Sequence, residues 1–119
     1  MTRSKREPGD YLNDILENAV TLKSFVQGLS FDDFSADMKT QYAVARALEI
    51  IGEATKRIPE DIRNSNPHIP WRKMAGMRDV LTHEYEGVSA SILYHTATNE
   101  IDQIIEPLRA VVAALDQSD

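Results

Sequence analysis

The sequence contains no cysteine among its 119 residues. This absence excludes disulfides, a thiolate nucleophile and cysteine-ligated zinc, and it is consistent with a reducing cytoplasm. The sequence also lacks an apolar run of the roughly 18 residues that a membrane-spanning helix needs. Its basic first residues, MTRSKREPGD, lead into no apolar signal segment. We therefore expect a soluble, cytoplasmic protein.

Positive charge is in short supply, since the formal net charge is −6. This balance argues against non-specific binding to nucleic acid, which needs local positive charge. The charges are unevenly distributed: residues 39–78 carry eight Lys/Arg and four Asp/Glu, whereas residues 79–119 carry one and eight. A solvated helix surface of mixed sign explains this pattern. A local anion-binding face next to Arg78 is the alternative.

The length and the 42% hydrophobic content suit one compact domain over residues 1–119, with residues 1–9 as a flexible N-terminus. Apolar residues recur at spacings of three and four in four segments, which predicts four amphipathic helices. The first ends at Gly28, and the second covers about residues 36–57 with Ser35 as its cap. The third begins at Trp71 after Pro70, and the fourth follows a cap at Ser89.

The remaining segments are connectors. Residues 58–70, IPEDIRNSNPHIP, contain three prolines, so we predict an irregular connection with one helical turn around residues 61–63. Gly87 is placed to stop the third helix, and Pro107 should kink the fourth. No strand alternation or repeat is present. The predicted fold is an all-α, up-and-down bundle of four to five helices.

The second predicted helix has two apolar stripes, which suits a central position in the bundle. One stripe comprises Val44, Leu48, Ile51 and Ile58, and the other comprises Met38, Tyr42, Ala45 and Gly52. In the fourth helix a single stripe runs through Leu93, Ala97, Ile101, Ile104, Leu108, Val111 and Leu115.

The third predicted helix carries an unusual combination of side chains near its end. A helical wheel puts Met74, Met77 and Leu81 on the core face. Arg78 and Tyr85 fall within about 20° of each other, whereas His83 would point about 140° away from Arg78. The histidine can join the arginine in two ways. Either the backbone unwinds before Gly87, or the two side chains come from two copies of the chain.

Each of these residues also has an ordinary structural explanation. Arg78 can pair with an acidic neighbour on the surface, His83 can complement the helix dipole, and Tyr85 can be an amphipathic residue at the edge of the core. A metal site is disfavoured. Asp79 and His83 are four residues apart, but neither His68 nor His95 stands at a ligand-like spacing from them.

The joint pattern Arg78-x4-His83-x-Tyr85 resembles the signature of the HepT-like branch of the HEPN superfamily. These proteins are the toxin half of bacterial HEPN/minimal-nucleotidyltransferase toxin-antitoxin pairs. Further similar landmarks are Ile51-Gly52-Glu53-Ala54, Ile69-Pro70-Trp71, Gly76-Met77-Arg78 and Pro107-Leu108. Asp79 is a departure, because the family very often has asparagine there. A carboxylate at that position would repel a phosphodiester, or it could hold Arg78 or His83 in place.

The resemblance implies a type VII toxin: a homodimeric, metal-independent endoribonuclease that needs no cofactor and cleaves RNA in a cleft between protomers. His83 would transfer protons near neutral pH and Arg78 would bind phosphate oxygens. The resemblance also implies that a cognate nucleotidyltransferase antitoxin transfers AMP to Tyr85 and switches the enzyme off. The alternative is a non-catalytic helical dimerisation module that docks the nucleotidyltransferase.

Overall fold

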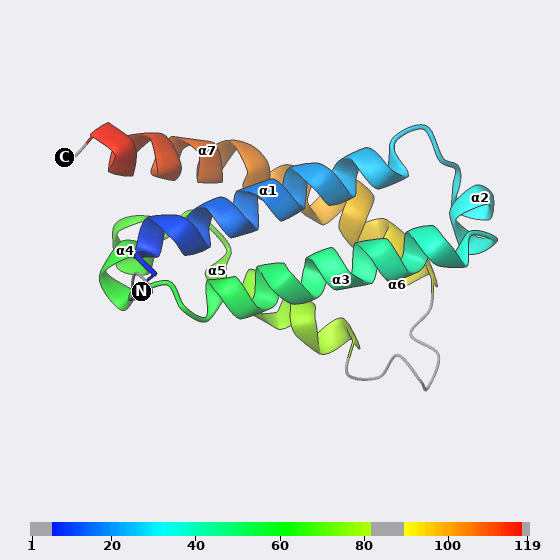
Figure 1. The fold of residues 1–119 in the computed structure, drawn as a ribbon, viewed down its shortest axis with the longest axis horizontal. Helices are drawn as coiled ribbons and strands as arrows, with labels where there is room; N and C mark the ends of the chain where they lie inside the picture. Colours follow the sequence, from blue (N-terminus) through cyan, green and yellow to red (C-terminus); the bar gives the residue numbers. More distant parts are fainter. Residues whose placement is uncertain (1–5, 82–89, 118–119) are drawn as a thin grey trace, which may run out of the picture.

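The computed structural model describes residues 6–81 and 90–117, which form helices and no strand (Figure 1). This confirms the all-α class. The α-helices are α1 (Pro8–Val26), α2 (Phe31–Ser35), α3 (Met38–Thr55), α4 (Glu60–Ser65), α5 (Trp71–Ala75), α6 (Ala90–His95) and α7 (Asp102–Gln117). A 3-10 helix, η1 (Gly76–Leu81), follows α5, and a π-helical turn, η3 (Thr96–Glu100), joins α6 to α7.

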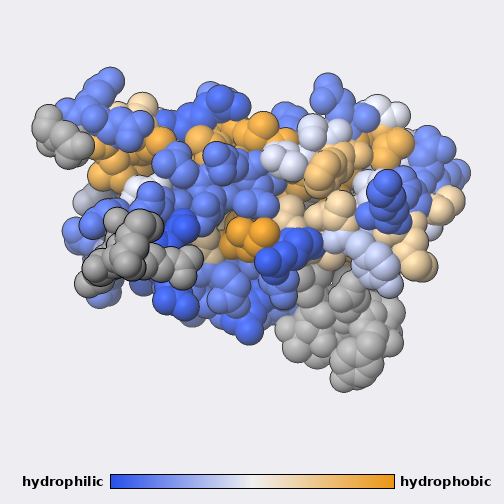
Figure 2. All heavy atoms as spheres, in the orientation of Figure 1, coloured by the Kyte–Doolittle hydropathy of each residue, from blue (hydrophilic) through white to orange (hydrophobic). Residues whose placement is uncertain are grey.

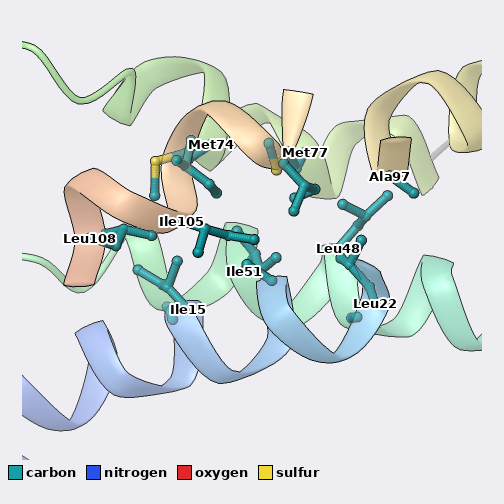
Figure 3. Packing of buried hydrophobic residues seen from close by; sticks show 14 of the residues in the cluster. Ile15, Leu22, Leu48, Ile51, Met74, Met77, Ala97, Ile105 and Leu108 are labelled. Atoms are coloured by element: carbon teal, nitrogen blue, oxygen red, sulfur yellow. The ribbon is translucent and has the colours of Figure 1, made fainter. Parts of the chain in front are cut away.

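Helix α3 lies at the centre of the bundle. It runs antiparallel to α1 and also contacts α2, α5, η1 and α6 (Figure 1). The predicted stripes of α1 and α3 meet between them, and Leu12, Ile15, Leu22, Leu48 and Ile51 are fully buried. Helix α7 packs on α1 and contributes Ile105 and Leu108 to the same core (Figure 3). The central role predicted for the second apolar segment is therefore confirmed.

One stripe of α3 departs from the prediction. Ala45 and Gly52 are buried as expected, but Met38 and Tyr42 on the first turns are 63% and 61% exposed. The stripe is therefore largely exposed at the start of α3 and buried further along it. The apolar pattern therefore overestimates how far the core extends along α3.

Two helix starts also differ from the prediction. Pro8 and Gly9, which we placed in the flexible N-terminus, form the first turn of α1, and Asp10 Oδ2 accepts a 2.8 Å hydrogen bond from the Glu7 amide. The cap of α3 is Asp37 and not Ser35. Ser35 instead ends α2, an extra short helix in which Ser30 and Asp33 form a capping box.

The cap of α3 is well defined. Asp37 Oδ1 accepts a hydrogen bond from the Thr40 amide at 3.0 Å, and Oδ2 accepts one from the Thr40 hydroxyl at 2.6 Å. The hydroxyl hydrogen bond, followed by the amide hydrogen bond, lowers the pKa of the partly exposed Asp37 carboxyl. The charged form of Asp37 is therefore the one that the helix start favours.

The third segment begins as predicted and then changes geometry. Pro70 precedes the first helical residue, Trp71, whose indole N–H donates a 3.0 Å hydrogen bond to the Asn66 carbonyl. The α-helix lasts only five residues before η1 begins at Gly76. Met74 and Met77 point into the core as expected (Figure 3). The side chain of Leu81 and the predicted cap at Ser89 lie outside the part of the chain that the structure describes.

The fourth segment is interrupted by a wide turn. At η3 the Ile101 amide donates to the Thr96 carbonyl at 3.0 Å, which is the i→i+5 pattern of a π-helix. The apolar stripe nevertheless continues, because Leu93, Ala97, Ile101 and Ile104 are all buried. Helix α7 runs on through Pro107, and the kink there stays a prediction. None of the helices in the described ranges combines the length and apolar character required to cross a membrane.

Candidate functional site

The 3-10 geometry of η1 turns Arg78 outward. Met77 is 3% exposed and faces the core. In a 3-10 helix each residue is rotated by about 120° from the one before it. Arg78 and Asp79 therefore both leave the core face, in different directions, and both are exposed. Because Met77 is anchored in the core, it holds η1 in place and directs the Arg78 side chain toward solvent.

Gly52 lets η1 lie directly against α3. A Cβ atom at Gly52 would stand 2.6 Å from Arg78 Cβ and 2.9 Å from the Arg78 amide nitrogen. It would also stand 3.2 Å from the Ala75 carbonyl oxygen. These distances leave no room for a side chain, so the absence of a Cβ atom sets the spacing between the two helices.

The next residue of α3 holds the other end of the Arg78 side chain. Arg78 Nη1 lies 2.6 Å from Glu53 Oε1, and the two side chains are 45% and 47% exposed. The surface ion pair that sequence reasoning kept as an alternative is therefore present. Among the described residues, Arg78 pairs with Glu53 rather than with the neighbouring Asp79.

Several basic residues of the segment 39–78 pair with carboxylates in the folded chain. Arg46 pairs with Glu49 on α3, and Lys73 of α5 pairs with Glu100 of η3. A groove of about 500 Å³ beside Glu53 carries arginines and carboxylates together. It is lined by Arg6, Tyr11, Asp14, Arg46, Glu49, Ile50, Glu53, Ala54 and Arg57. Hydrophilic residues dominate the middle of the face where α1 and α3 run (Figure 2). These pairs favour the mixed-sign surface over a broad basic face.

The other predicted site residues, His83 and Tyr85, lie outside the described ranges. The two remaining histidines are exposed. His68 borders a groove between α4 and α7, and the Nδ1 atom of His95 lies 3.2 Å from Asn99 Nδ2. Within residues 6–81 and 90–117 no three His, Asp or Glu side chains are grouped so that they could hold a metal ion.

Comparison with known proteins decides the family. Residues 15–111 match the HepT-like ribonuclease family, described as "Ribonuclease HepT-like". The chain belongs to this family. The HepT-like match covers most of the chain and includes Gly52, Glu53, Arg78 and the segment that carries the motif. It confirms the resemblance inferred from the Arg78-x4-His83-x-Tyr85 pattern.

Several curated relatives are similar over nearly their whole length. A Thermococcus cleftensis protein named "Probable ribonuclease HepT" is 49% identical over 100 residues, which cover 84% of this chain and 91% of the relative. A "Putative RNase" of Methanocaldococcus jannaschii is 38% identical over 115 residues, covering 97% and 95%. Another, from Caldanaerobacter subterraneus, is 39% identical over 107 residues, covering 90% and 96%. No solved structure matches this HepT-like chain.

Sequence reasoning found Arg78 but not its partner. Glu53 was noted only as part of a landmark in the second helix. No spacing rule links residues 53 and 78, because they lie on different elements that meet only in the folded bundle. The available signal was indirect: a glycine followed by an acidic residue in the middle of an apolar stripe of the helix.

Proposed function

We propose that this HepT-like protein is a toxin that cleaves RNA without a metal ion, with Arg78 of one protomer and His83 of another acting in a shared cleft. Family membership supports the ribonuclease class. The observation that carries the assignment to Arg78 is its position: a half-exposed guanidinium, fixed against α3, immediately before the segment that contains His83. An arginine placed there can reach a phosphate from the solvent side.

The proposed step uses the nucleophile that RNA itself provides. The 2′-hydroxyl loses its proton to a base and attacks the adjacent phosphorus, so that the 2′-oxygen to phosphorus bond forms. The bond from phosphorus to the 5′-oxygen breaks, and the leaving oxygen receives a proton. An imidazole suits these transfers because its ordinary pKa lies near neutral pH. A guanidinium matches the oxygens of the more negative transition state.

The decisive test is RNA cleavage by purified protein in EDTA. We expect wild-type cleavage in EDTA, and a loss of about 100-fold or more for both His83→Ala and Arg78→Ala. Arg72→Ala is the matched control, since Arg72 is an exposed arginine of the same segment and its removal changes the net charge equally. Circular dichroism checks that each variant is folded. Wild-type rates in His83→Ala would remove this histidine from the reaction.

The proposed regulation acts through Tyr85. A partner nucleotidyltransferase would join the tyrosine oxygen to the α-phosphorus of ATP and release pyrophosphate. The resulting anionic adduct would compete for the Arg78 guanidinium and so oppose RNA binding. Co-expression with the nucleotidyltransferase should add the mass of one AMP to the wild-type chain and not to Tyr85→Phe. Equal masses of the wild-type chain with and without the partner would contradict this regulation.

A second function is favoured by one observation. Arg78 is already neutralised by Glu53, and the exposed Asp79 adds a further negative charge beside it. This arrangement suits a helical module that dimerises and docks a nucleotidyltransferase without cleaving RNA. Expression in a bacterium without the antitoxin separates the two functions. Growth arrest that Arg78→Ala relieves supports the toxin, whereas harmless wild-type expression supports the docking module.

A further inference from the structure

We propose that Glu53 is a positioning residue for Arg78. It raises kcat, the rate at which bound RNA is cleaved, and it weakens the binding of RNA. The inference rests on the proposed function, in which Arg78 stabilises the phosphate during cleavage. Its basis is the way in which two consecutive residues of α3 engage the arginine. Gly52 receives the Arg78 backbone and Cβ atom, and Glu53 binds the guanidinium.

Together these contacts restrain both ends of a long, flexible side chain. A Cβ atom at Gly52 would overlap Arg78 at 2.6 Å, so η1 is seated against α3 with little room to shift. The 2.6 Å contact between Arg78 Nη1 and Glu53 Oε1 then limits where the guanidinium can point. Without the carboxylate, an exposed arginine would be distributed over many rotamers, and few of them would face a given phosphate.

The form of the ion pair leaves Arg78 able to bind a second anion. In this ion pair Glu53 Oε1 contacts Arg78 Nη1, and a guanidinium carries N–H donors on all three of its nitrogens. Both partners are about half exposed, so the contact contributes little to folding stability. The pair is therefore better suited to orient Arg78 than to stabilise the bundle.

Glu53 has an opposite effect on substrate binding. Its carboxylate cancels positive charge next to the proposed phosphate site, which weakens the attraction of RNA. Removing Glu53 should then lower kcat, because Arg78 is less well oriented, while KM stays equal or falls. General destabilisation of the protein would not give this combination, because it lowers the amount of active enzyme without strengthening RNA binding.

The same helix supplies a matched control. Glu49 pairs with Arg46 through Nη1 and Oε1 at 2.5 Å, and the Glu49 side chain is 44% exposed, close to the 47% of Glu53. Glu49→Ala therefore removes an equivalent surface ion pair and the same negative charge from α3. It leaves the pair between Arg78 and Glu53 in place.

The experiment compares steady-state cleavage of one short RNA by the full chain. The proteins are wild type, Glu53→Ala, Glu53→Gln, Glu49→Ala and Arg78→Ala, each with its melting temperature measured. We expect Glu53→Ala to lower kcat about tenfold with KM unchanged or lower. Glu53→Gln, which keeps an oxygen acceptor for Arg78, should recover part of kcat. Glu49→Ala should retain the wild-type kcat.

The possible failures are distinguishable. If Arg78→Ala is inactive but both Glu53 variants keep the wild-type kcat, Glu53 does not position Arg78 and the proposed function stands. A higher KM at unchanged kcat in the Glu53 variants would also overturn the inference. If Arg78→Ala cleaves as wild type does, or if wild type does not cleave RNA, the proposed function fails and the inference fails with it. Glu53→Gln decides the question if Glu53→Ala does not fold.

Discussion

At the residue scale, the environment of Arg78 depends on what its neighbours lack as well as on what they carry. Gly52 contributes no side chain, and that absence lets the backbone of η1 approach α3 closely. Met77 is buried in the core and so directs the next side chain outward. Glu53 supplies a carboxylate that meets the guanidinium at 2.6 Å. Gly52, Met77 and Glu53 together determine where the Arg78 side chain lies.

Gly52→Ala is the residue-scale prediction. The added Cβ atom would overlap Arg78 and approach the Ala75 carbonyl, so η1 must move. We expect a loss of about 1–3 kcal/mol in the free energy of unfolding, as for other overpacked sites. Chemical denaturation with urea, followed by circular dichroism, measures it.

Gly76→Ala is the control for that substitution. A Cβ atom at Gly76 would meet only Asp79 Oδ2, at 3.9 Å, which is an ordinary contact distance. Its stability should be unchanged or slightly higher, because alanine restricts the unfolded chain more than glycine does. Equal stability of Gly52→Ala and wild type would contradict the close approach of α3 and η1.

At the scale of elements, the molecule departs from regular α-helix at η1, where it tightens, and at η3, where it widens. The tightened turn carries Arg78 and Asp79 away from the core immediately after Met77. The wide turn lets the apolar stripe continue from Leu93 through Ile104 across the junction of α6 and α7. The change of helical pitch at η3 therefore keeps the apolar stripe buried, and the change at η1 places Arg78 and Asp79 on the surface.

The cap of α3 gives the element-scale prediction. The folded pKa of Asp37 lies below its ordinary value of about 3.8, chiefly because of the Thr40 hydroxyl. Its contribution to stability is therefore present above pH 3.8 and is lost as the pH falls through the folded pKa. Asp37→Asn still caps the helix but does not titrate. We expect its melting temperature to be below wild type at pH 6 and to converge with wild type near pH 2.

Melting curves across that pH range measure the effect of the cap. Asp116→Asn removes an exposed carboxylate near the end of α7 and controls for the change in net charge. The Asp116→Asn curve should not show the same convergence. A difference between wild type and Asp37→Asn that persists unchanged to pH 2 would mean that the charge of Asp37 does not stabilise the start of α3.

At the scale of the whole molecule, the proposed mechanism requires Arg78 and His83 of different protomers to meet in one cleft. In the proposed dimer, each site takes an arginine from one protomer and a histidine from the other. Inactive Arg78→Ala and inactive His83→Ala chains should then complement each other, because a mixed dimer contains one intact site. Equimolar mixing after subunit exchange should restore about a quarter of the wild-type activity.

The mixing experiment also tests the opposite arrangement. If both residues act within one chain, every chain in the mixture lacks one of them and no activity returns. Mixing His83→Ala with itself is the control for changes caused by dilution and exchange alone. Size-exclusion chromatography with light scattering establishes whether the dimer forms at the concentration that is assayed.

Much of the fold could be predicted because apolar spacing reports directly on burial. The stripes through Leu12 to Val26 and through Leu93 to Val111 are buried as the three- and four-residue periodicity indicated. Pro70 marked the start of α5 because its ring suits the boundary of a helix. The α3 cap was misplaced, because Ser35 and Asp37 are both good caps and only the structure of α2 shows which one is free to act.

The sequence by itself determined the helical class, most of the core and the family, because these depend on local periodicity and on a short motif whose residues are close in the chain. Tertiary structure alone decided that Glu53 binds Arg78 and that Gly52 makes room for it. Those contacts join α3 to η1, two elements separated by α4 and α5 in the sequence. Such a pairing depends on how the helices pack, which no local pattern encodes.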